Sequence, residues 1–509
     1  MNRARKAQDK LGWLIGMLVI SMVVGMAAPR VALAAPETPH GGTPVGGAAV
    51  GDLSLYMPLA QKDACTTLKS PGFGGFQVFG GAGFSSPYYK DLMESGASWI
   101  RLQFDWSSVE PQNTVPSGYN WPYLDAEVSL AAEQCWPIIL QLNFNPPWAS
   151  DLPEGPLTKT SVAEIAELMG AVAERYDGDG INDGPGSPQV VYFEMYNEPD
   201  AGASGAYERW GLHGDQYAAM LKAVYPAVKA ANPQAKVVFG GIAYDSFTDS
   251  PNPGVFVKQF LEDVLKSGGG AYFDIMNYHF YPLFGWNWTK QFPKDGPGLL
   301  EKTAAIQAVL AKYNSSKPII ITETSWHSNK GASIYGSNTL QVRLLQQLFT
   351  QAKAAGVPMV AWWPIADVGG SYQLESGVVT NSESGPVTRK PSYYAYLVFV
   401  RELGTARFVA EISLYSDVKV YQFSDDARGR TIYVAWTNPT DLNTMWGSSG
   451  VPYQDTTRTT TIKLDAESVT VYDANWIKVT SVADGDDRKD DGKVTVTING
   501  DPKYIVSGG

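Results

Sequence analysis

Short apolar runs and segments of helical periodicity alternate along the chain from about Gly72 to residue 403. A short apolar run bounded by turn residues predicts a buried strand, whereas apolar residues that recur every three to four positions predict an amphipathic helix. The strand candidates are GFQVF (75–79), SWIRLQF (98–104), WPIILQLN (136–143), VVYFEMYN (190–197), KVVFGG (236–241), FDIMNYH (273–279), KPIIITE (317–323) and VPMVAWW (357–363). The helix candidates include 161–175, 215–232, 300–313, 338–355 and 390–403.

This alternation predicts an α/β fold, and eight strands each followed by a helix favour a (β/α)8 TIM barrel over residues 72–403. An open doubly wound sheet with extra units is the competing architecture. After residue 403 the helical period disappears, and stretches such as RTIYVAWTN alternate in polarity between turn-rich pieces such as ADGDDRKDDG. We therefore expect a C-terminal all-β, sandwich-like domain over 404–509.

The first 71 residues carry different signals. A basic start, an apolar run from Leu11 to Ala28 and the sequence VALA predict a secretory signal peptide over 1–34, cleaved after Ala34. The alternative is an uncleaved anchor that would hold the protein at the cell surface. Residues 35–51 are rich in Gly and Pro and predict a flexible linker, followed by an N-terminal segment (52–71) that leads into the barrel.

Composition excludes several classes of protein. The net charge of −12, with no basic stretch in the expected mature chain, argues against a nucleic-acid partner. No later segment is long and apolar enough to span a membrane once the leader is cleaved. Nucleotide-binding motifs and Cys/His metal spacings are missing, so we expect no cofactor and no metal. DGDGIND (177–183) is oxygen-rich, but a solvated turn is favoured over a calcium loop. The two cysteines, Cys65 and Cys135, form either one bridge or two unrelated thiols.

Two glutamates end strands on opposite sides of the predicted barrel. Active sites of such barrels lie at the C-terminal ends of the strands. The fourth strand ends in Asn197 and Glu198, and the seventh ends in Glu323. Either glutamate alone could cap a helix or pair with a base, but two carboxylates that face each other across a cleft are the requirement for glycoside hydrolysis. Glu194 shares a face with Glu198 but lies deeper, so we expect it to be a structural partner of Arg101.

Asn197-Glu198-Pro199 after the fourth strand, with Glu323 in ITET, resembles the retaining glycoside hydrolases of clan A. The wider text is most similar to family 39 and its neighbours over about 72–402, particularly in YHFYP (278–282) and KPSYYAY (390–396). The resemblance implies that Glu198 is the general acid/base, that Glu323 is the nucleophile and that Asn197 binds the sugar 2-hydroxyl.

The same resemblance extends to three further side chains. Arg101 alternates with Ile100 and Leu102, which predicts a position inside the barrel, either as a cation beside the nucleophile or as a buried salt-bridge partner. His279 and Tyr281 lie two residues apart at the end of the sixth strand, hence on one face. Their counterparts in the family contact the nucleophile and the sugar.

Tryptophans gather after the predicted strands, where sugar rings can stack on them. Trp326 follows the seventh strand and is a candidate for binding substrate. Alternation allows only one of Trp362 and Trp363 to face inward, and Trp362 is the predicted platform under the reacting sugar. The others, Trp106, Trp148, Trp286 and Trp288, serve equally well as subsite walls or as loop packing.

The sequence thus predicts a secreted retaining glycoside hydrolase that acts on polysaccharide or oligosaccharide through a covalent glycosyl-enzyme. The alternative is a carbohydrate-binding cell-surface protein that kept the barrel and lost turnover. The presence of Asn197 together with both glutamates favours the enzyme.

Overall fold

The computed structural model describes residues 68–79, 87–202, 208–245, 255–330, 335–368, 375–381, 385–413, 415–441 and 454–508. The predicted signal peptide (1–34), the linker (35–51) and most of the N-terminal segment (52–71) lie outside these ranges. Cys135 is disulfide-bonded. The only other cysteine of the sequence, Cys65, also lies outside the described residues.

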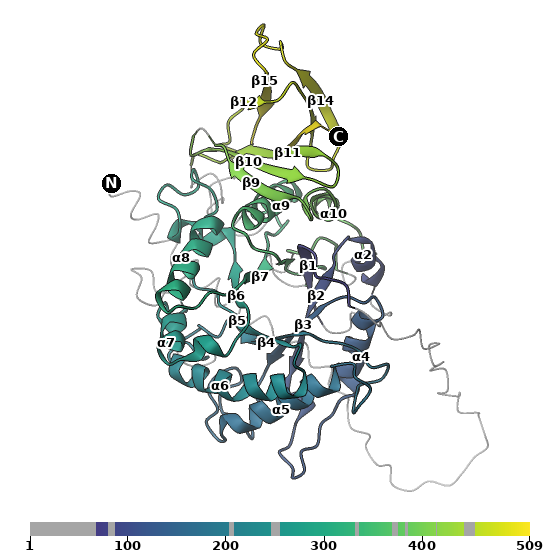
Figure 1. The fold of residues 1–509 in the computed structure, drawn as a ribbon, viewed down its shortest axis with the longest axis vertical. Helices are drawn as coiled ribbons and strands as arrows, with labels where there is room; N and C mark the ends of the chain where they lie inside the picture. The colour runs from purple at the N-terminus through teal and green to yellow at the C-terminus, as the bar shows by residue number, and fades with distance from the viewer. Residues whose placement is uncertain are drawn as a thin grey trace, which may run out of the picture.

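Eight parallel strands form the barrel, as the alternation of the sequence predicts (Figure 1). They are β1 (Gly74–Val78), β2 (Trp99–Asp105), β3 (Ile138–Asn143), β4 (Tyr192–Asn197), β5 (Lys236–Gly241), β6 (Met276–Phe280), β7 (Ile319–Thr324) and β8 (Val360–Trp362). The ladder runs β5-β4-β3-β2-β1-β8-β7-β6. Two isolated bridges, Val238 with Ile275 and Ile242 with Tyr278, join β5 to β6. The sheet therefore closes on itself, which excludes the open doubly wound alternative.

Helices surround this sheet (Figure 1). They are α2 (Tyr89–Glu94), α3 (Trp106–Val109), α4 (Pro122–Ala132), α5 (Val162–Arg175), α6 (Gly214–Ala231), α7 (Phe260–Lys266), α8 (Leu299–Lys312), α9 (Asn338–Ala354) and α10 (Pro391–Leu403), with short 3₁₀ turns at η1 (Gly269–Ala271) and η2 (Pro282–Asn287). Serines begin two of them: the Ser161 side chain accepts from the Ala163 N–H, and Ser337 accepts from the Leu340 N–H. These caps satisfy N–H groups that the first helical turn leaves without partners.

The pore of the barrel is filled in two chemically different layers. Its lower part is apolar and contains Trp99, Ile139, Val238, Ile275, Ile320, Met359 and Ala361. A Cβ on Gly75 would lie 2.3 Å from the Trp99 ring, so glycine at this position admits the indole. Two residues further along the strands, the inward positions turn polar, and Gln77, Arg101, Gln141, Glu194, Asn277 and Thr322 are all buried. The change of chemistry between the two layers marks the floor of the site.

The C-terminal region is all β, as predicted. Its strands are β9 (Arg407–Glu411), β10 (Val418–Asp425), β11 (Arg430–Thr437), β12 (Thr460–Asp465), β13 (Ser468–Tyr472), β14 (Lys478–Ala483), β15 (Lys493–Ile498) and β16 (Lys503–Gly508). A six-stranded sheet of order β14-β13-β16-β11-β10-β9 packs against the two-stranded sheet β12-β15 through a separate apolar core. Val420, Ile462 and Val496 are central members of this core.

The opposite face of the six-stranded sheet lies on the barrel, beside α9 and α10 (Figure 1). Its apolar residues, including Phe423, Val434 and Trp436, belong to the same core as the barrel helices. Polar contacts surround this interface. Arg343 of α9 lies 2.8 Å from both Asp455 and Asp501. The central strands β10, β11 and β16 therefore bury side chains on both faces of the sheet, whereas the edge strands β9 and β14 are largely exposed. Within the described residues, no helix combines the length and the apolar character that crossing a membrane requires.

We expect Arg343→Met to lower the free energy of unfolding by about 1–3 kcal/mol, because it leaves two carboxylates without their buried cation. Urea or thermal denaturation measures this loss. The control is Arg407→Met, which removes an exposed arginine 3.8 Å from Asp426 and should cost less than about 0.5 kcal/mol. Equal losses in the two variants would contradict a special role of Arg343 between barrel and β-sheets.

Candidate active site

A buried arginine organises the polar layer of the pore. All five N–H donors of Arg101, on β2, have acceptors. Nε and Nη2 donate to the two oxygens of Glu194 at 2.7 Å each, and Nη2 also donates to Asn197 Oδ1 at 2.9 Å. Nη1 donates to Gln77 Oε1 at 2.8 Å and to Glu323 Oε1 at 2.7 Å. The predicted pairing of Glu194 with Arg101 is therefore present, and the same guanidinium also reaches Glu323.

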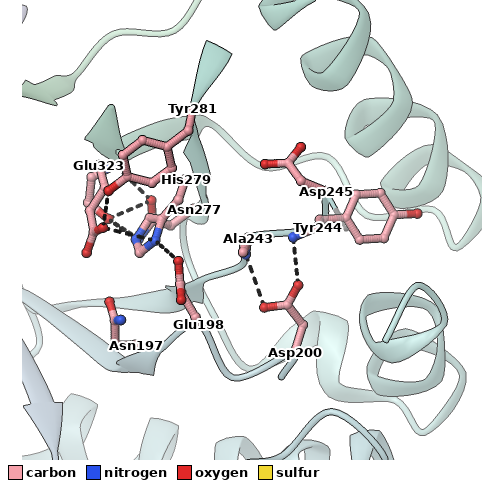
Figure 2. A network of polar contacts seen from close by, with 12 residues as sticks. Asn197, Glu198, Asp200, Ala243, Tyr244, Asp245, Asn277, His279, Tyr281 and Glu323 are labelled. Atoms are coloured by element: carbon pink, nitrogen blue, oxygen red, sulfur yellow. Dashed lines mark hydrogen bonds and ion pairs between the residues drawn. The ribbon is translucent and has the colours of Figure 1, made fainter. Parts of the chain in front are cut away.

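Glu323 is held from a second side. The Tyr281 hydroxyl donates to its Oε2 at 2.7 Å, and His279 Nδ1 lies 3.5 Å from the same oxygen (Figure 2). Both carboxylate oxygens of Glu323 therefore accept hydrogen bonds. His279 and Tyr281 extend from the end of β6 towards β7, so the structure brings the three predicted residues together.

Glu198 begins the turn after β4. Its backbone N–H donates to the Gly241 carbonyl at 3.0 Å, and its φ of 42° directs the chain out of the strand. Its Oε1 lies 3.1 Å from His279 Nδ1 (Figure 2). Potential ligand atoms of Glu198, His279 and Glu323 all lie within 4.8 Å of one another. A Cβ on Gly241 would lie 2.2 Å from His279 Nε2, so glycine at this position leaves space for the imidazole.

Burial sets the proton affinities of these groups. It raises the pKa of Glu198, against the lowering effect of Arg209, Arg101 and Lys302. Burial also lowers the pKa of His279 to about 4, so its ring is neutral at ordinary pH. For Tyr281, burial and then the charge of Glu323 hold the pKa well above its usual range, so the phenol remains a donor. The site therefore holds a carboxyl whose pKa is raised by burial beside a neutral imidazole.

Asn197 precedes Glu198 and is fixed through both its side chain and its backbone. In addition to the contact from Arg101, its carbonyl accepts a bond from Arg209 Nη1 at 2.5 Å. Arg209 in turn lies 2.8 Å from Glu154. The carboxyl end of β4 is thus held by a cation on each side.

The prediction that Trp362 faces the sugar is wrong. Trp362 has 0% of its surface exposed, its ring packs against Phe349 of α9, and its Nε1 donates to the Ser376 carbonyl at 2.8 Å. It therefore points out of the barrel into the helix layer. Trp363 has the opposite direction and lies edge-to-face with Phe79, the residue that follows β1, at 6.0 Å. By alternation, Phe79 shares the inward side of Gln77.

Two further features of the sequence are Trp326 and the DGDGIND turn (177–183), and the structure gives the contacts of both. Trp326 is buried and stacks on His327 at 5.2 Å, a packing role within the described structure. In the DGDGIND turn, carboxylate oxygens of Asp177, Asp179 and Asp183 lie within 4.8 Å of one another. Asp177 and Asp183 accept bonds from backbone N–H groups of the same turn, as a self-satisfied turn requires.

Three buried charged groups behind Glu198 escaped prediction. Asp200 accepts from the Ala243 and Tyr244 N–H groups at 3.1 and 2.8 Å (Figure 2). Asp245 pairs with Lys302 at 2.9 Å. The sequence carries one signal for Lys302: it shares the buried stripe of α8 with Leu299, Thr303, Ile306 and Leu310, where lysine is out of place.

The model of the cellulase family (glycosyl hydrolase family 5) matches residues 68–365. No curated protein matches the chain in sequence. Among solved structures, the chain is similar to a family 39 glycoside hydrolase from the gut symbiont Bacteroides cellulosilyticus, at 19% identity over 86% of this chain and 81% of that one, with a TM-score of 0.62.

Two further solved structures are matched over nearly their whole length. The chain is similar to a family 30 endoxylanase from Clostridium papyrosolvens, at 14% identity over 87% of this chain and 98% of that one, with a TM-score of 0.55. It is also similar to a family 51 α-L-arabinofuranosidase from Bifidobacterium longum, at 12% identity over 87% and 97% of the two chains, with a TM-score of 0.50. At these identities the likeness establishes a shared fold.

We expect Arg101→Met to lower the free energy of unfolding by about 3–5 kcal/mol, because it leaves Glu194 buried without its cation. Adding Glu194→Gln should restore part of this stability, since the unpaired charge is then removed. Chemical denaturation of the two single variants and the double variant forms the cycle. Strictly additive losses would show that the two side chains do not interact.

Proposed function

Because the chain belongs to the cellulase family (glycosyl hydrolase family 5), we propose that it is a glycoside hydrolase that cleaves its substrate with retention of configuration. The predicted membership of clan A and the predicted enzyme class are confirmed by this family. The further proposal concerns the roles of the two glutamates: Glu323 attacks the anomeric carbon, and Glu198 acts first as acid and then as base.

The separation of the two carboxylates supports retention. A carboxylate oxygen of Glu198 and one of Glu323 lie within 4.8 Å of each other. Retaining glycosidases place the two carboxyl groups about 5–5.5 Å apart, whereas inverting enzymes need about 6.5–9.5 Å to admit a water molecule between carboxylate and sugar. The short separation suits direct attack by one carboxylate.

The surroundings distinguish the roles. Glu323 accepts hydrogen bonds on both oxygens, from the Arg101 guanidinium and the Tyr281 phenol, which is the pattern of an ionised nucleophile. Glu198 is buried, and this burial raises its pKa, which suits an acid that must hold a proton. The neutral imidazole of His279 lies between them and gives neither carboxylate a competing positive charge.

In the first step, a Glu323 oxygen bonds to the anomeric carbon while the glycosidic bond breaks and Glu198 gives its proton to the departing oxygen. In the second step, the ionised Glu198 takes a proton from water, whose oxygen displaces Glu323 from the sugar. Asn197, oriented by Arg101, is placed to bind the 2-hydroxyl. Trp363 replaces Trp362 as the proposed platform beneath the sugar, because it lies on the inward side of β8.

We further propose that the protein is secreted and acts on polysaccharide or its oligosaccharides. The basic and apolar leader sequence supports export, and the cellulase family supports a glycan substrate. A non-catalytic carbohydrate-binding protein would not need Arg101 and Tyr281 to hold Glu323 beside Glu198, so the complete constellation favours the enzyme.

Glu323→Gln should lower kcat by about a thousandfold or more, because it removes the nucleophile while preserving shape. Activity is measured on a panel of aryl β-glucosides, β-xylosides and α-arabinofuranosides and on soluble glucans and xylans. Glu467→Gln, an exposed carboxylate of the β-sheet region, is the matched control and should remain fully active. Unchanged turnover of the Glu323 variant would refute the assignment.

Glu198→Ala should still be glycosylated by substrates with very good leaving groups, since these need no protonation, and should then stall. Azide should restore turnover by attacking the intermediate, giving a glycosyl azide of retained configuration, identified by proton NMR. An inverted product would contradict the double displacement.

Trp363→Ala and Trp362→Ala should differ in kind. Trp363→Ala should raise KM or lower kcat by about tenfold or more, because it removes a stacking surface. Trp362→Ala should lower the free energy of unfolding by about 3–5 kcal/mol, because it empties a fully buried site. Enzyme kinetics and thermal denaturation on both variants test the assignment, and the reverse pattern would restore Trp362 as the platform.

A further inference from the structure

The seam between β5 and β6, where the ladder of the barrel is irregular, lies beside Glu198. Between β5 and β6 the regular ladder is replaced by two isolated bridges. Lys302 enters this seam from α8. Its Nζ donates to the carbonyl of Ala243, just after β5, and to the carbonyl of His279, on β6, at 2.7 Å for the latter. A third contact, at 2.9 Å, joins it to Asp245. One side chain therefore links both strands at the mouth of the barrel.

The seam holds Lys302 as a fully buried cation. Its exposed fraction is 0%, and its ammonium lies 5.4 Å from the Tyr278 ring centroid and 5.6 Å from that of Trp288. Trp288 Nε1 donates to Asp245 Oδ1 at 2.6 Å, which fixes the counter-ion. A well-packed apolar side chain usually stabilises such a position as well as a buried ion pair does. A lysine here therefore points to a role beyond stability.

Two of the partners of Lys302, His279 and Ala243, are connected to Glu198 or to the turn that follows it (Figure 2). The imidazole of His279, whose carbonyl Lys302 holds, contacts Glu198 Oε1 at 3.1 Å. Ala243, whose carbonyl it also holds, donates its N–H to Asp200, two residues beyond Glu198. The Glu198 N–H itself is bound to Gly241 at the end of β5. Movement of either strand at the seam would thus displace the carboxyl of Glu198.

We propose that Lys302 is a positioning residue for Glu198: it ties the chain after β5 to β6 at the seam and places a positive charge behind the carboxyl. This inference rests on the proposed role of Glu198 as acid/base. The closed seam keeps Glu198 at hydrogen-bonding distance from His279. The charge favours the ionised Glu198 that the second step needs, after the proton has left.

Several groups face Glu198, and their effects have different signs. They are Arg101 on β2, Glu154 after β3, Asp200 and Arg209 after β4, Asp245 after β5, His279 and Tyr281 at β6, Glu323 on β7 and Lys302 on α8. Burial raises the pKa of Glu198, and Arg209, Arg101 and Lys302 lower it. Removing Lys302 therefore raises this pKa further, and the newly unpaired Asp245 acts in the same direction.

The test is the pH dependence of kcat/KM for Lys302→Met, compared with the wild type on one aryl glycoside. The alkaline limb reports loss of the proton from Glu198. We expect this limb to move to higher pH by about 0.5 unit or more, and kcat to fall about tenfold as the carboxyl loses its fixed position. Lys302→Arg keeps the charge and should leave the limb near its wild-type position.

Lys353→Met is the matched control. Lys353 lies on α9, donates to the Gly404 carbonyl at 3.0 Å and covers the Phe73 ring, away from Glu198. It should change stability without moving the limb. If Lys302→Met fails to fold, Lys302→Met in an Asp245→Asn background, compared with Asp245→Asn alone, removes the same cation without leaving an unpaired aspartate.

The outcomes separate the two proposals. An inactive wild-type protein overturns the proposed function and the role of Lys302 together. An active wild type whose alkaline limb stays in place in the Lys302→Met variants overturns only the role of Lys302. A stability loss with an unshifted limb would leave Lys302 as a purely structural clamp and would equally overturn the proposal. A shift of the same size in Lys353→Met would assign the effect to general loosening.

Discussion

The guanidinium of Arg101 is the interaction on which the site depends. It joins four strands across the pore, because its acceptors lie on β1, β4 and β7 while its own backbone is on β2. A buried guanidinium requires full pairing, and its five donors find Gln77, Glu194, Asn197 and Glu323. Glu194 and Glu323 both accept hydrogen bonds from this guanidinium, whose positive charge offsets their negative charges inside the barrel. The charge that keeps the polar layer stable is therefore the same charge that orients the proposed nucleophile and Asn197.

A chain of backbone and side-chain contacts continues from this layer to Glu198, the proposed acid/base. His279 lies between Glu198 and Glu323, and the packing that leaves space for its ring comes from Gly241 on the neighbouring strand. Behind it, the pKa of Asp200 is raised to about 7 by burial and then by Glu198, and that of Asp245 to about 6 by burial against the effect of Lys302. Besides Glu198, the neighbouring buried carboxyls of Asp200 and Asp245 therefore also have raised pKa values.

Much of this arrangement could be predicted from the sequence, because its determinants are local. Apolar runs fixed the strands to within a few residues, and strand ends fixed Glu198 and Glu323, since a barrel places all such ends on one rim. The pairing of Glu194 with Arg101 followed from their depth along the strands.

The failures have a common cause: they depend on which side of an element a residue faces, or on contacts across the chain. The direction of Trp362 depends on the register of β8, a strand of three residues in which alternation has little length to establish itself. Lys302 lies on helix α8 and reaches the site at the irregular joint between β5 and β6. The amino-acid sequence of α8 gives no sign of that irregularity.

The central strands of the six-stranded C-terminal sheet, which bury side chains on both faces, make the barrel depend on this region. One face carries its own core with β12-β15, and the other completes the outer wall of the barrel at α9 and α10. A chain ending at Leu403 would leave part of that wall open to water and prone to self-association. We therefore expect the barrel to need the C-terminal sheets in order to remain monodisperse in solution.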